Sequence, residues 1–302
     1  MQSINKTFII IVNYNSWKDT LICLEDLKQK YWENFEVVLV DNCSTDNSAE
    51  SIENYISGHD LSFIKEKSTN QNLPIHFLKS DFNKGFASGN NIGIEFAQSK
   101  YDKPFYIWML NNDTVVENNS LPNLISFFES DNYGLIGSKI LDFDPPHEIQ
   151  SLYGTFNKFT GRAKTIRNLN SKKQISYPIG ASLFLTSEII NNLGGLNEEY
   201  FLYHEEIDYS LRVLKNNLKI GVCLDSIVFH KQGASTGSFK NKKKKNLHIE
   251  EYKYNGLLLL YKNYFRRFII IAYANLIIKA FKFSFKGEFA NARLIFKVIS
   301  KR

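Results

Sequence analysis

Apolar runs of strand length alternate with helix-periodic segments through the first half of the chain. The runs are rich in Val, Ile, Leu and Phe, with little regular polar alternation, which is typical of strands buried on both faces. They occupy residues 8–12, 35–40, 75–79 and 105–110. Strand, helix, strand order requires right-handed crossovers and gives a parallel sheet. The sequence therefore predicts an α/β fold with a Rossmann-like start and a mostly parallel central sheet.

The second half has a less regular pattern. Residues 141–176 contain a Pro pair and a polar stretch, which favours a hairpin or loop that covers a cleft. A strand is expected within 177–187, a helix over 201–217 and a last strand pair over 219–230. In that helix an apolar stripe that includes Ile207 and Leu211 marks the buried face.

Composition excludes a disordered or fibrous chain, because 43% of the residues are hydrophobic and 14% are aromatic. The net charge of +6 is uneven: residues 1–239 hold 21 basic and 28 acidic side chains, and residues 240–302 hold 16 and 3. An acidic globular part repels phosphate backbones, so we expect no nucleic-acid partner. We predict a globular domain over 1–240, with halves at about 1–115 and 116–240, and a basic, aromatic helical tail over 241–302.

The tail is the part that suggests a membrane. From Lys253 onward there are 11 basic residues and one acid, interleaved with Tyr, Phe and Ile. This pattern favours helices at the surface of an anionic membrane, while packing on the domain or a homodimer interface is the alternative. The longest apolar run, 268–278, has 11 residues, and a span needs about 20. We therefore expect a peripheral protein.

Localisation is predicted from the N-terminus and the cysteines. No charged region followed by a long apolar stretch opens the chain, so we expect no secretory signal. Cys23, Cys43 and Cys223 are far apart and form no CxxC pair, which favours reduced thiols in the cytosol. The expected location is the cytoplasm, on the inner face of the plasma membrane.

Polar residues follow each predicted strand of the first half. Ligands of such sheets bind at the carboxyl ends of the strands, and Asn13, Asp41, Asn83 and residues 111–113 all lie just past those ends. Asn and Asp are also common loop and helix-capping residues, which is the alternative explanation. Four polar sets at one edge favour a binding site.

Seven motifs together resemble the family 2 glycosyltransferases, most closely the bacterial rhamnosyltransferase-like branch. The resemblance covers about residues 8–237, and the motifs read NYN (13–15), VDNCSTDNS (40–48), NKGFASGNNIG (83–93), LNNDTVV (110–116), GASLF (180–184), GGLNEEYFLYHEEIDYSLR (194–212) and FHKQGAST (229–236). The resemblance implies a GT-A fold, a nucleotide-diphosphate sugar donor, a divalent metal and inversion at the anomeric carbon. It also implies a glycan or lipid-linked glycan acceptor in cell-surface polysaccharide biosynthesis.

The same resemblance assigns residues to sites within a nucleotide-binding half and an acceptor-binding half. Asp113 and His230 match metal-binding positions, and an imidazole with a carboxylate favours Mn²⁺ while permitting Mg²⁺. The family often has an aspartate where this chain has Asn111. Gly180 and Asp208 match acceptor-binding positions. The residues expected to bind the donor are Asn13, Asn15, Asp41, Asn83, Gly85, Asn90 and Asn112.

Inverting transfer needs a base for the acceptor hydroxyl. The family places it in a Glu Asp pair ahead of a helix, and Glu206 stands here at the aspartate position, with Glu205 before it. Glutamate is one methylene longer, so Glu205 remains a second candidate. The alternative is that both acids stabilise a helix N-terminus while Asp208 pairs with Arg212.

Two other functions are alternatives to sugar transfer. A sugar nucleotidyltransferase shares the Rossmann-like start but normally has a Gly-rich loop with Arg and Lys after the first strand, which residues 13–16 lack. A non-enzymatic module that binds membranes or nucleic acid through the tail would leave the acidic residues of the cleft without a task. The sequence leaves open the sugar, the nucleotide, the acceptor and the oligomeric state.

Overall fold

The computed structural model describes residues 4–58, 73–168, 170–171, 173–231 and 247–301. Its strands are β1 (Thr7–Asn13), β2 (Phe35–Asp41), β3 (Ile75–Lys79), β4 (Tyr106–Leu110), β5 (Thr114–Val116), β6 (Tyr133–Asp142), β7 (Ile149–Ser151), β8 (Tyr153–Asn157), β9 (Arg162–Ile166), β10 (Ser182–Thr186) and β11 (Lys219–His230). The helices are α1 (Trp17–Lys28), α2 (Ser48–Ile56), α3 (Phe86–Lys100), α4 (Ser120–Glu129), α5 (Ser187–Leu193), α6 (Glu205–Lys215), α7 (Leu247–Tyr264), α8 (Ile269–Phe285) and α9 (Phe289–Ser300), with a 3-10 turn at Arg266–Phe268.

The central sheet has the strand order β3-β2-β1-β4-β10-β6-β11-β5, and β7 pairs with β6. The strands β3, β2, β1 and β4 are parallel, as their apolar runs and intervening helices predict. Beyond β4 the sheet is mixed, because β10 runs antiparallel to both of its neighbours and β5 runs antiparallel to β11. The predicted α/β fold with C-terminal helices is confirmed, with parallel pairing concentrated in the first half.

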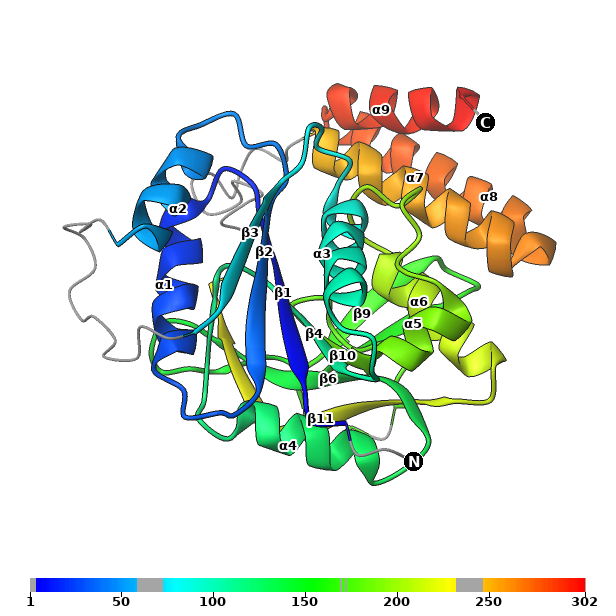
Figure 1. The fold of residues 1–302 in the computed structure, drawn as a ribbon. Coiled ribbons are helices and arrows are strands. Elements are labelled where there is room, and N and C mark those ends of the chain that lie inside the picture. Colours follow the sequence, from blue (N-terminus) through cyan, green and yellow to red (C-terminus); the bar gives the residue numbers. More distant parts are fainter. Residues whose placement is uncertain (1–3, 59–72, 169, 172, 232–246, 302) are drawn as a thin grey trace.

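Alternate side chains of each inner strand enter two separate cores. Figure 1 shows the helices that cover the two faces of the sheet. In β1, Ile9 and Ile11 pack with apolar residues of α1, α2 and α4. Phe8 and Ile10 point to the opposite face and pack with α3, α5 and α6. Burial on both faces explains why the strand is apolar at consecutive positions. The strand ends therefore form an edge between two helical layers.

Two predicted elements differ from those observed. The helix expected from residue 201 begins at Glu205, because Tyr203 and His204 have φ values of +71° and +76°, which no right-handed helix contains. The strand pair expected over 219–230 is the single strand β11, whose register against β6 shifts between Cys223 and Ile227. Its exposed bulge at Leu224 and Asp225 looked like a turn in the sequence. The hairpin expected in the middle of the chain is present as β8 and β9.

The helices α7, α8 and α9 lie together at the end of the molecule where β1 and β2 finish (Figure 1). Leu259 and Leu260 of α7 are buried in one cluster with Tyr200 and Ile207 of the preceding domain. The charge boundary near residue 240 therefore does not coincide with a packing boundary. Removing the whole tail would expose this apolar cluster to water.

One segment of the described chain, Arg266–Phe285, is long and apolar enough to cross a membrane by length and composition alone, with 20 residues and a mean hydropathy of 1.6. It is longer than the uninterrupted apolar run 268–278, from which no span was predicted. The longer segment has a high mean hydropathy because apolar residues surround Asn275, Lys279 and Lys282. Such a helix is weak support for a span, because core helices of soluble proteins meet the same criteria.

Candidate active site

The ends of β1, β2 and β4 meet in one buried polar network. Asn13 lies beside Asp41 in register, and its Nδ2 donates to Asp41 Oδ1 at 2.7 Å. Thr20 Oγ1 donates to Asn13 Oδ1 at 2.8 Å, and Asn112 Nδ2 donates to Thr20 Oγ1 at 2.8 Å. Thr20 thus links Asn13, Asp41 and Asn112, three residues predicted to bind the nucleotide sugar. Thr20 itself was not predicted from the sequence. Its place one turn into α1, after the Asn-rich end of β1, was the available signal.

Asp41 is held by Ser44, a second residue that the motif alone did not single out. Ser44 donates its backbone N–H to Asp41 Oδ2 at 3.0 Å and its hydroxyl to Oδ1 at 2.6 Å. Asp41 is only 3% exposed, and three hydrogen bonds leave one of about four acceptor positions of the carboxylate. Asp41 fixes the loop after β2, and its contact with a nucleotide stays a prediction.

Asn15 closes the same loop from the other side. Its backbone is left-handed, with φ +52°, and its Oδ1 accepts from the backbone N–H of Thr45 at 2.7 Å. The Asn15 side chain is exposed, unlike that of Asn13. The loops after β1 and β2 are therefore joined through Asn15 and Ser44.

The segment after β3 is organised by Asn42. Its Nδ2 donates to Asn83 Oδ1 at 3.1 Å and to the Gly85 carbonyl at 3.0 Å. Asn42 Oδ1 is buried and has no hydrogen-bond partner among the described residues. An unpaired buried acceptor is costly, so a donor group of a ligand would be stabilised there. Asn42 is therefore a further candidate, beside the predicted Asn83 and Gly85, for contact with the nucleotide sugar.

The glycines of α3 serve packing. A side chain at Gly89 would meet Val12 at 2.7 Å, and one at Gly93 would meet Ile10 at 2.5 Å. Gly85 has φ +94°, and a Cβ there would lie 2.0 Å from the Phe201 carbonyl oxygen. That carbonyl also accepts from Phe86 N at 2.8 Å. Gly85 therefore seats the loop before α6 against the start of α3.

Asn90 is buried, and its Nδ2 donates to the carbonyl of Phe86 within α3 at 2.9 Å. This bond turns the amide group back onto its own helix. Asn91 instead bridges to the loop after α5, accepting from Leu196 N at 2.8 Å and donating to the Leu196 carbonyl. The donor contact predicted for Asn90 stays a prediction.

Asp113 and His230 converge although 117 positions separate them. His230 ends β11, whose last residues pair with β5, and Asp113 immediately precedes β5. His230 Nε2 lies 3.1 Å from Asp113 Oδ1, and Asn111 Nδ2 is 3.3 Å from the same nitrogen. Both side chains are buried, with Asp113 5% and His230 8% exposed. Among the described residues, here or elsewhere, no group of three or more His, Cys, Asp or Glu is arranged so that it could hold a metal ion.

Gln150 of β7 sets the orientation of His230. Gln150 Nε2 donates to Asp142 Oδ1 at 2.9 Å and to the His230 carbonyl at 3.0 Å, so its Oε1 is the acceptor that faces His230 Nδ1 at 2.8 Å. Gln150 therefore fixes a hydrogen on Nδ1, while Nε2 faces Asp113 Oδ1 and Asn111 Nδ2. A histidine ligand is commonly fixed in this way by an outer hydrogen bond. The residues present therefore fit a divalent cation held by two protein ligands.

This arrangement predicts the tautomer of His230 directly. In ¹⁵N-histidine NMR spectra of the protein without metal, we expect the His230 ring to carry its hydrogen on Nδ1. Replacing Gln150 with Leu should remove that preference, because leucine cannot accept a hydrogen bond. His230→Ala assigns the signal among the six histidines, and His147→Ala, at an exposed position, is the matched control. A His230 ring without a hydrogen on Nδ1 in the unmodified protein would contradict the assignment.

The two predicted base candidates open α6 in different surroundings. Glu205 is 5% exposed and Glu206 is half-buried. Burial, with the neighbouring Glu206 charge, raises the pKa of Glu205 well above its usual range. Burial raises the pKa of Glu206 to about 7, against hydrogen bonds from backbone N–H groups that lower it. Each has one buried carboxylate oxygen without a partner among the described residues.

These pKa values separate the roles of the pair. Burial and the neighbouring Glu206 charge favour the protonated form of Glu205, which does not accept a proton. Glu206 titrates near neutral pH, where a general base is most effective. In known active sites, paired carboxyl groups often have different surroundings that give them different pKa values. The raised pKa of Glu206 is consistent with the predicted base, and that role stays a prediction.

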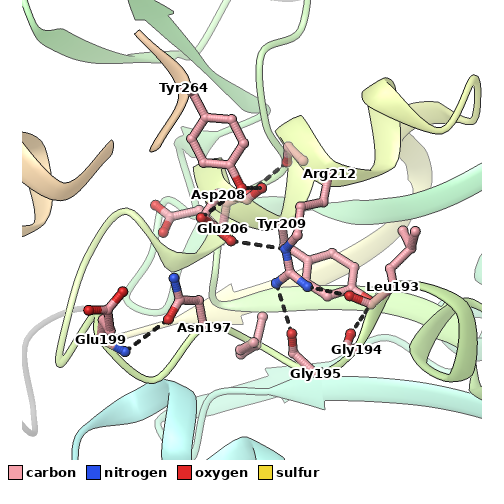
Figure 2. A network of polar contacts seen from close by, with 12 residues as sticks. Leu193, Gly194, Gly195, Asn197, Glu199, Glu206, Asp208, Tyr209, Arg212 and Tyr264 are labelled. Carbon is pink, nitrogen blue, oxygen red and sulfur yellow. Dashed lines mark hydrogen bonds and ion pairs between the residues drawn. The ribbon is translucent and has the colours of Figure 1, made fainter. Parts of the chain in front are cut away.

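Asp208 belongs to a structural network (Figure 2). Arg212 Nε donates to Asp208 Oδ2 at 3.0 Å, and the Tyr264 hydroxyl of α7 donates to Oδ1 at 2.9 Å. Arg212 also donates to the carbonyls of Leu193 and Gly195, each at 2.8 Å. Asp208 is 1% exposed. The pairing with Arg212 that the sequence offered as the alternative is therefore present, and Asp208 links α5, α6 and α7.

Gly180, the other predicted acceptor residue, has open space where a side chain would lie. It precedes β10, which pairs with β4. No ligand position follows from this alone, but the open space is compatible with a cleft at that edge.

The family model described as glycosyl transferase family 2 matches residues 8–194. The chain is 26% identical over 236 residues to the low-salt glycan biosynthesis hexosyltransferase Agl10 of Haloferax volcanii, a match that covers 77% of this chain and 69% of that protein. It is 23% identical over 230 residues to the dTDP-rhamnosyl transferase RfbF of Shigella flexneri, which covers 75% and 69%. Both relatives are therefore longer than the matched part.

A solved structure shows the same fold. The mannosyltransferase PcManGT of Pyrobaculum calidifontis, in complex with GDP-Man and Mn²⁺, superposes with a TM-score of 0.59 at 10% identity. The match covers 99% of this chain and 75% of that one. At this identity the likeness concerns the fold, and it extends to the C-terminal helices.

Proposed function

This chain belongs to glycosyl transferase family 2, and from that premise we propose that it moves a sugar from a nucleotide-diphosphate sugar to a hydroxyl of a glycan acceptor, with inversion. The observation that carries the proposal is the convergence of Asp113 and His230 at the sheet edge that also holds Asn13 and Asp41. Family membership removes the basis for a nucleotidyltransferase or a non-enzymatic module.

The metal in this proposal is Mn²⁺ or Mg²⁺, held by Asp113 and His230. Two protein ligands suffice, because donor phosphates and water supply the remaining positions of a hard cation. The bound ion would neutralise charge that develops on the leaving diphosphate. Asn13, Asn42, Asn83 and Asn112 are neutral, so they would not repel the diphosphate. PcManGT, which binds Mn²⁺ with GDP-Man, supports this assignment by analogy.

Glu206 takes the proton of the acceptor hydroxyl in the proposed reaction. The hydroxyl oxygen forms the new bond to the anomeric carbon as the bond to the diphosphate breaks, and the proton passes to the Glu206 carboxylate. Burial favours the protonated form of Glu205, which in this proposal would keep a second negative charge away from the attacking oxygen. Gly180 leaves room for the acceptor near β10.

The acceptor is proposed to be a glycan of cell-surface polysaccharide synthesis, lipid-linked and met at the cytoplasmic face of the membrane. The glycan biosynthesis named for Agl10 supports this class of product. The rhamnosyltransferase-like branch stays a prediction, since identity to RfbF is 23% and identity to the hexosyltransferase Agl10 is 26%. A test of donor binding should therefore include both nucleotide hexoses and nucleotide deoxyhexoses. A homodimer likewise stays a prediction.

Thermal unfolding of the purified chain against a panel of nucleotide sugars tests the proposal. With Mn²⁺ present, one class of nucleotide sugar should raise the melting temperature, because a ligand that binds only the folded state stabilises it. The rise should shrink when EDTA removes the metal. Free nucleosides and free sugars are the controls. No stabilisation by any nucleotide sugar, with or without Mn²⁺, would reject the proposal.

A further inference from the structure

The tail helix α8 has two apolar faces, of which the fold uses one. Ala272, Leu276, Ala280 and Phe283 are buried against α7 and α9. The other side is exposed to solvent, although its residues are large and apolar. Their exposed fractions are 77% for Ile270, 37% for Ile271, 37% for Ile277, 52% for Ile278, 54% for Phe281 and 89% for Phe285.

The helix α9 extends this surface. Phe289 and Phe296 are 60% and 44% exposed, and the ring of Phe296 lies edge-on to that of Phe281 with centroids 6.2 Å apart. We call these eight residues the tail apolar face. Monomeric soluble proteins rarely expose contiguous patches of this kind, and larger ones mark interaction surfaces.

Positive charge accompanies this face. Lys282, Lys286 and Arg293 are exposed on α8, the turn after it and α9, and Lys297, also exposed, pairs with Glu251 at 3.2 Å. Glu288 is the one acid after residue 253, and it accepts a hydrogen bond from Asn291. A partner for this surface must therefore offer negative charge beside an apolar layer.

We infer that the tail apolar face docks on an anionic lipid monolayer, with α8 lying in the interface plane. Apolar side chains enter the boundary of headgroups and acyl chains while Lys and Arg contact the anionic headgroups, the arrangement of interfacial helices. A second copy of this chain is a poorer match, because a two-fold interface places the same patch on itself and would bring these cations together.

Packing argues against α8 as a membrane span. To cross a bilayer, α8 would have to leave α7 and α9 and expose Leu258 and Ile295, which are 1% and 0% exposed. It would also carry Lys279 and Lys282 into the hydrocarbon, where each is costly. In the interface, the same lysines reach the headgroups and the packed face stays packed.

The docked face is coupled to the candidate active site through α7. The ring of Tyr252 stacks on Phe201 at 4.1 Å, and Lys253 lies 4.7 Å from the ring of Tyr203. Tyr203 and His204 directly precede Glu205. Docking would thus place the base loop near the membrane surface, where a lipid-linked acceptor is located. This last consequence rests on the proposed function, whereas lipid binding does not.

Vesicle flotation of the full chain tests the inference. We expect binding to phosphatidylcholine vesicles that contain phosphatidylglycerol, weaker binding to phosphatidylcholine alone, and partial release at high salt, since surface attraction is screened within about 10 Å. The double variant Phe281→Asp, Phe285→Asp should lower partitioning roughly 100-fold, because two aromatic side chains no longer leave water. Tyr31→Asp is the matched control, with a 95% exposed aromatic outside the tail.

A second pair of measurements separates the alternatives. Lys282→Gln with Lys286→Gln should weaken binding to anionic vesicles by roughly 10-fold or more and leave binding to neutral vesicles unchanged. Alkaline carbonate should extract the protein, and resistance to extraction would instead indicate a span. A dimer without lipid that dissociates in the Phe281, Phe285 variant would assign the face to a second copy. Equal binding to neutral and anionic vesicles, or none, would also overturn the inference.

Donor binding in the same variants keeps the two proposals apart. Both variants should bind a nucleotide sugar with Mn²⁺ as the unmodified chain does, because the substituted residues lie outside the site. Loss of vesicle binding with donor binding retained supports the tail face. Absence of donor binding in every protein, the unmodified chain included, would reject the proposed function and leave the lipid result standing.

Discussion

Asp113→Asn is expected to lower Mn²⁺-dependent binding of a nucleoside diphosphate by roughly 100-fold or more, since a carboxylate ligand is worth several kcal/mol at such a site. The amide keeps the volume of the side chain but loses its negative charge beside His230 Nε2. Isothermal titration calorimetry with and without Mn²⁺ measures the effect. His230→Ala should weaken binding less, because water can occupy a vacated ligand position.

Asp131→Asn is the matched control for that experiment. Asp131 forms an ion pair with Lys219, and both side chains are largely exposed, 42% and 58%. Exposed pairs contribute little to stability, so this variant should bind like the unmodified chain. If Asp113→Asn also binds normally while its melting curve is unchanged, Asp113 does not hold the metal.

Glu206→Gln is expected to reduce turnover about 100-fold or more, with donor affinity nearly unchanged, because glutamine cannot accept the proton of the acceptor hydroxyl. In the unmodified enzyme, kcat/KM should rise as pH increases through about 7, where Glu206 loses its proton. The variant should lose this acidic limb. Glu205→Gln is the matched control, since glutamine imitates the protonated acid expected there, and its turnover should stay close to that of the unmodified enzyme.

The same pKa predicts a stability profile that needs no substrate. Between about pH 4.5 and pH 7 the folded chain binds more protons at Glu206 than the unfolded chain does. The free energy of unfolding should therefore fall as pH rises through 7, and Glu206→Gln should flatten this fall. Loss of turnover in Glu205→Gln, with Glu206→Gln active, would reverse the assignment of the base.

The sequence was sufficient where local pattern decides the structure. Consecutive apolar residues at 8–12, 35–40 and 105–110 predicted strands buried on two faces, and parallel strands bring their ends to one edge. That is why Asn13 and Asp41 could be expected to meet. Asp113 and His230 were paired through the family resemblance, and their observed distance agrees with it.

Long-range packing decided what the sequence left open. Gln150 reaches His230 only because β7 pairs with β6, and no local pattern specifies that pairing. The start of α6 depends on two left-handed residues, Tyr203 and His204, which lie against Gly256 of α7. The predicted domain boundary at residue 240 was based on the charge distribution. The packing of α7 depends instead on the apolar cluster that includes Ile207.

The fit of Gly85 against the Phe201 carbonyl limits how this enzyme can be recombined with its relatives. A chimera that exchanges halves near residue 115 would take Gly85 from one parent and Phe201 from the other, together with the Asn91 bonds to Leu196. The two surfaces would then meet without having been matched to each other. Residues 194–204 therefore belong with the predicted nucleotide-binding half, residues 1–115, for engineering purposes, although they lie about 80 positions beyond it in the chain.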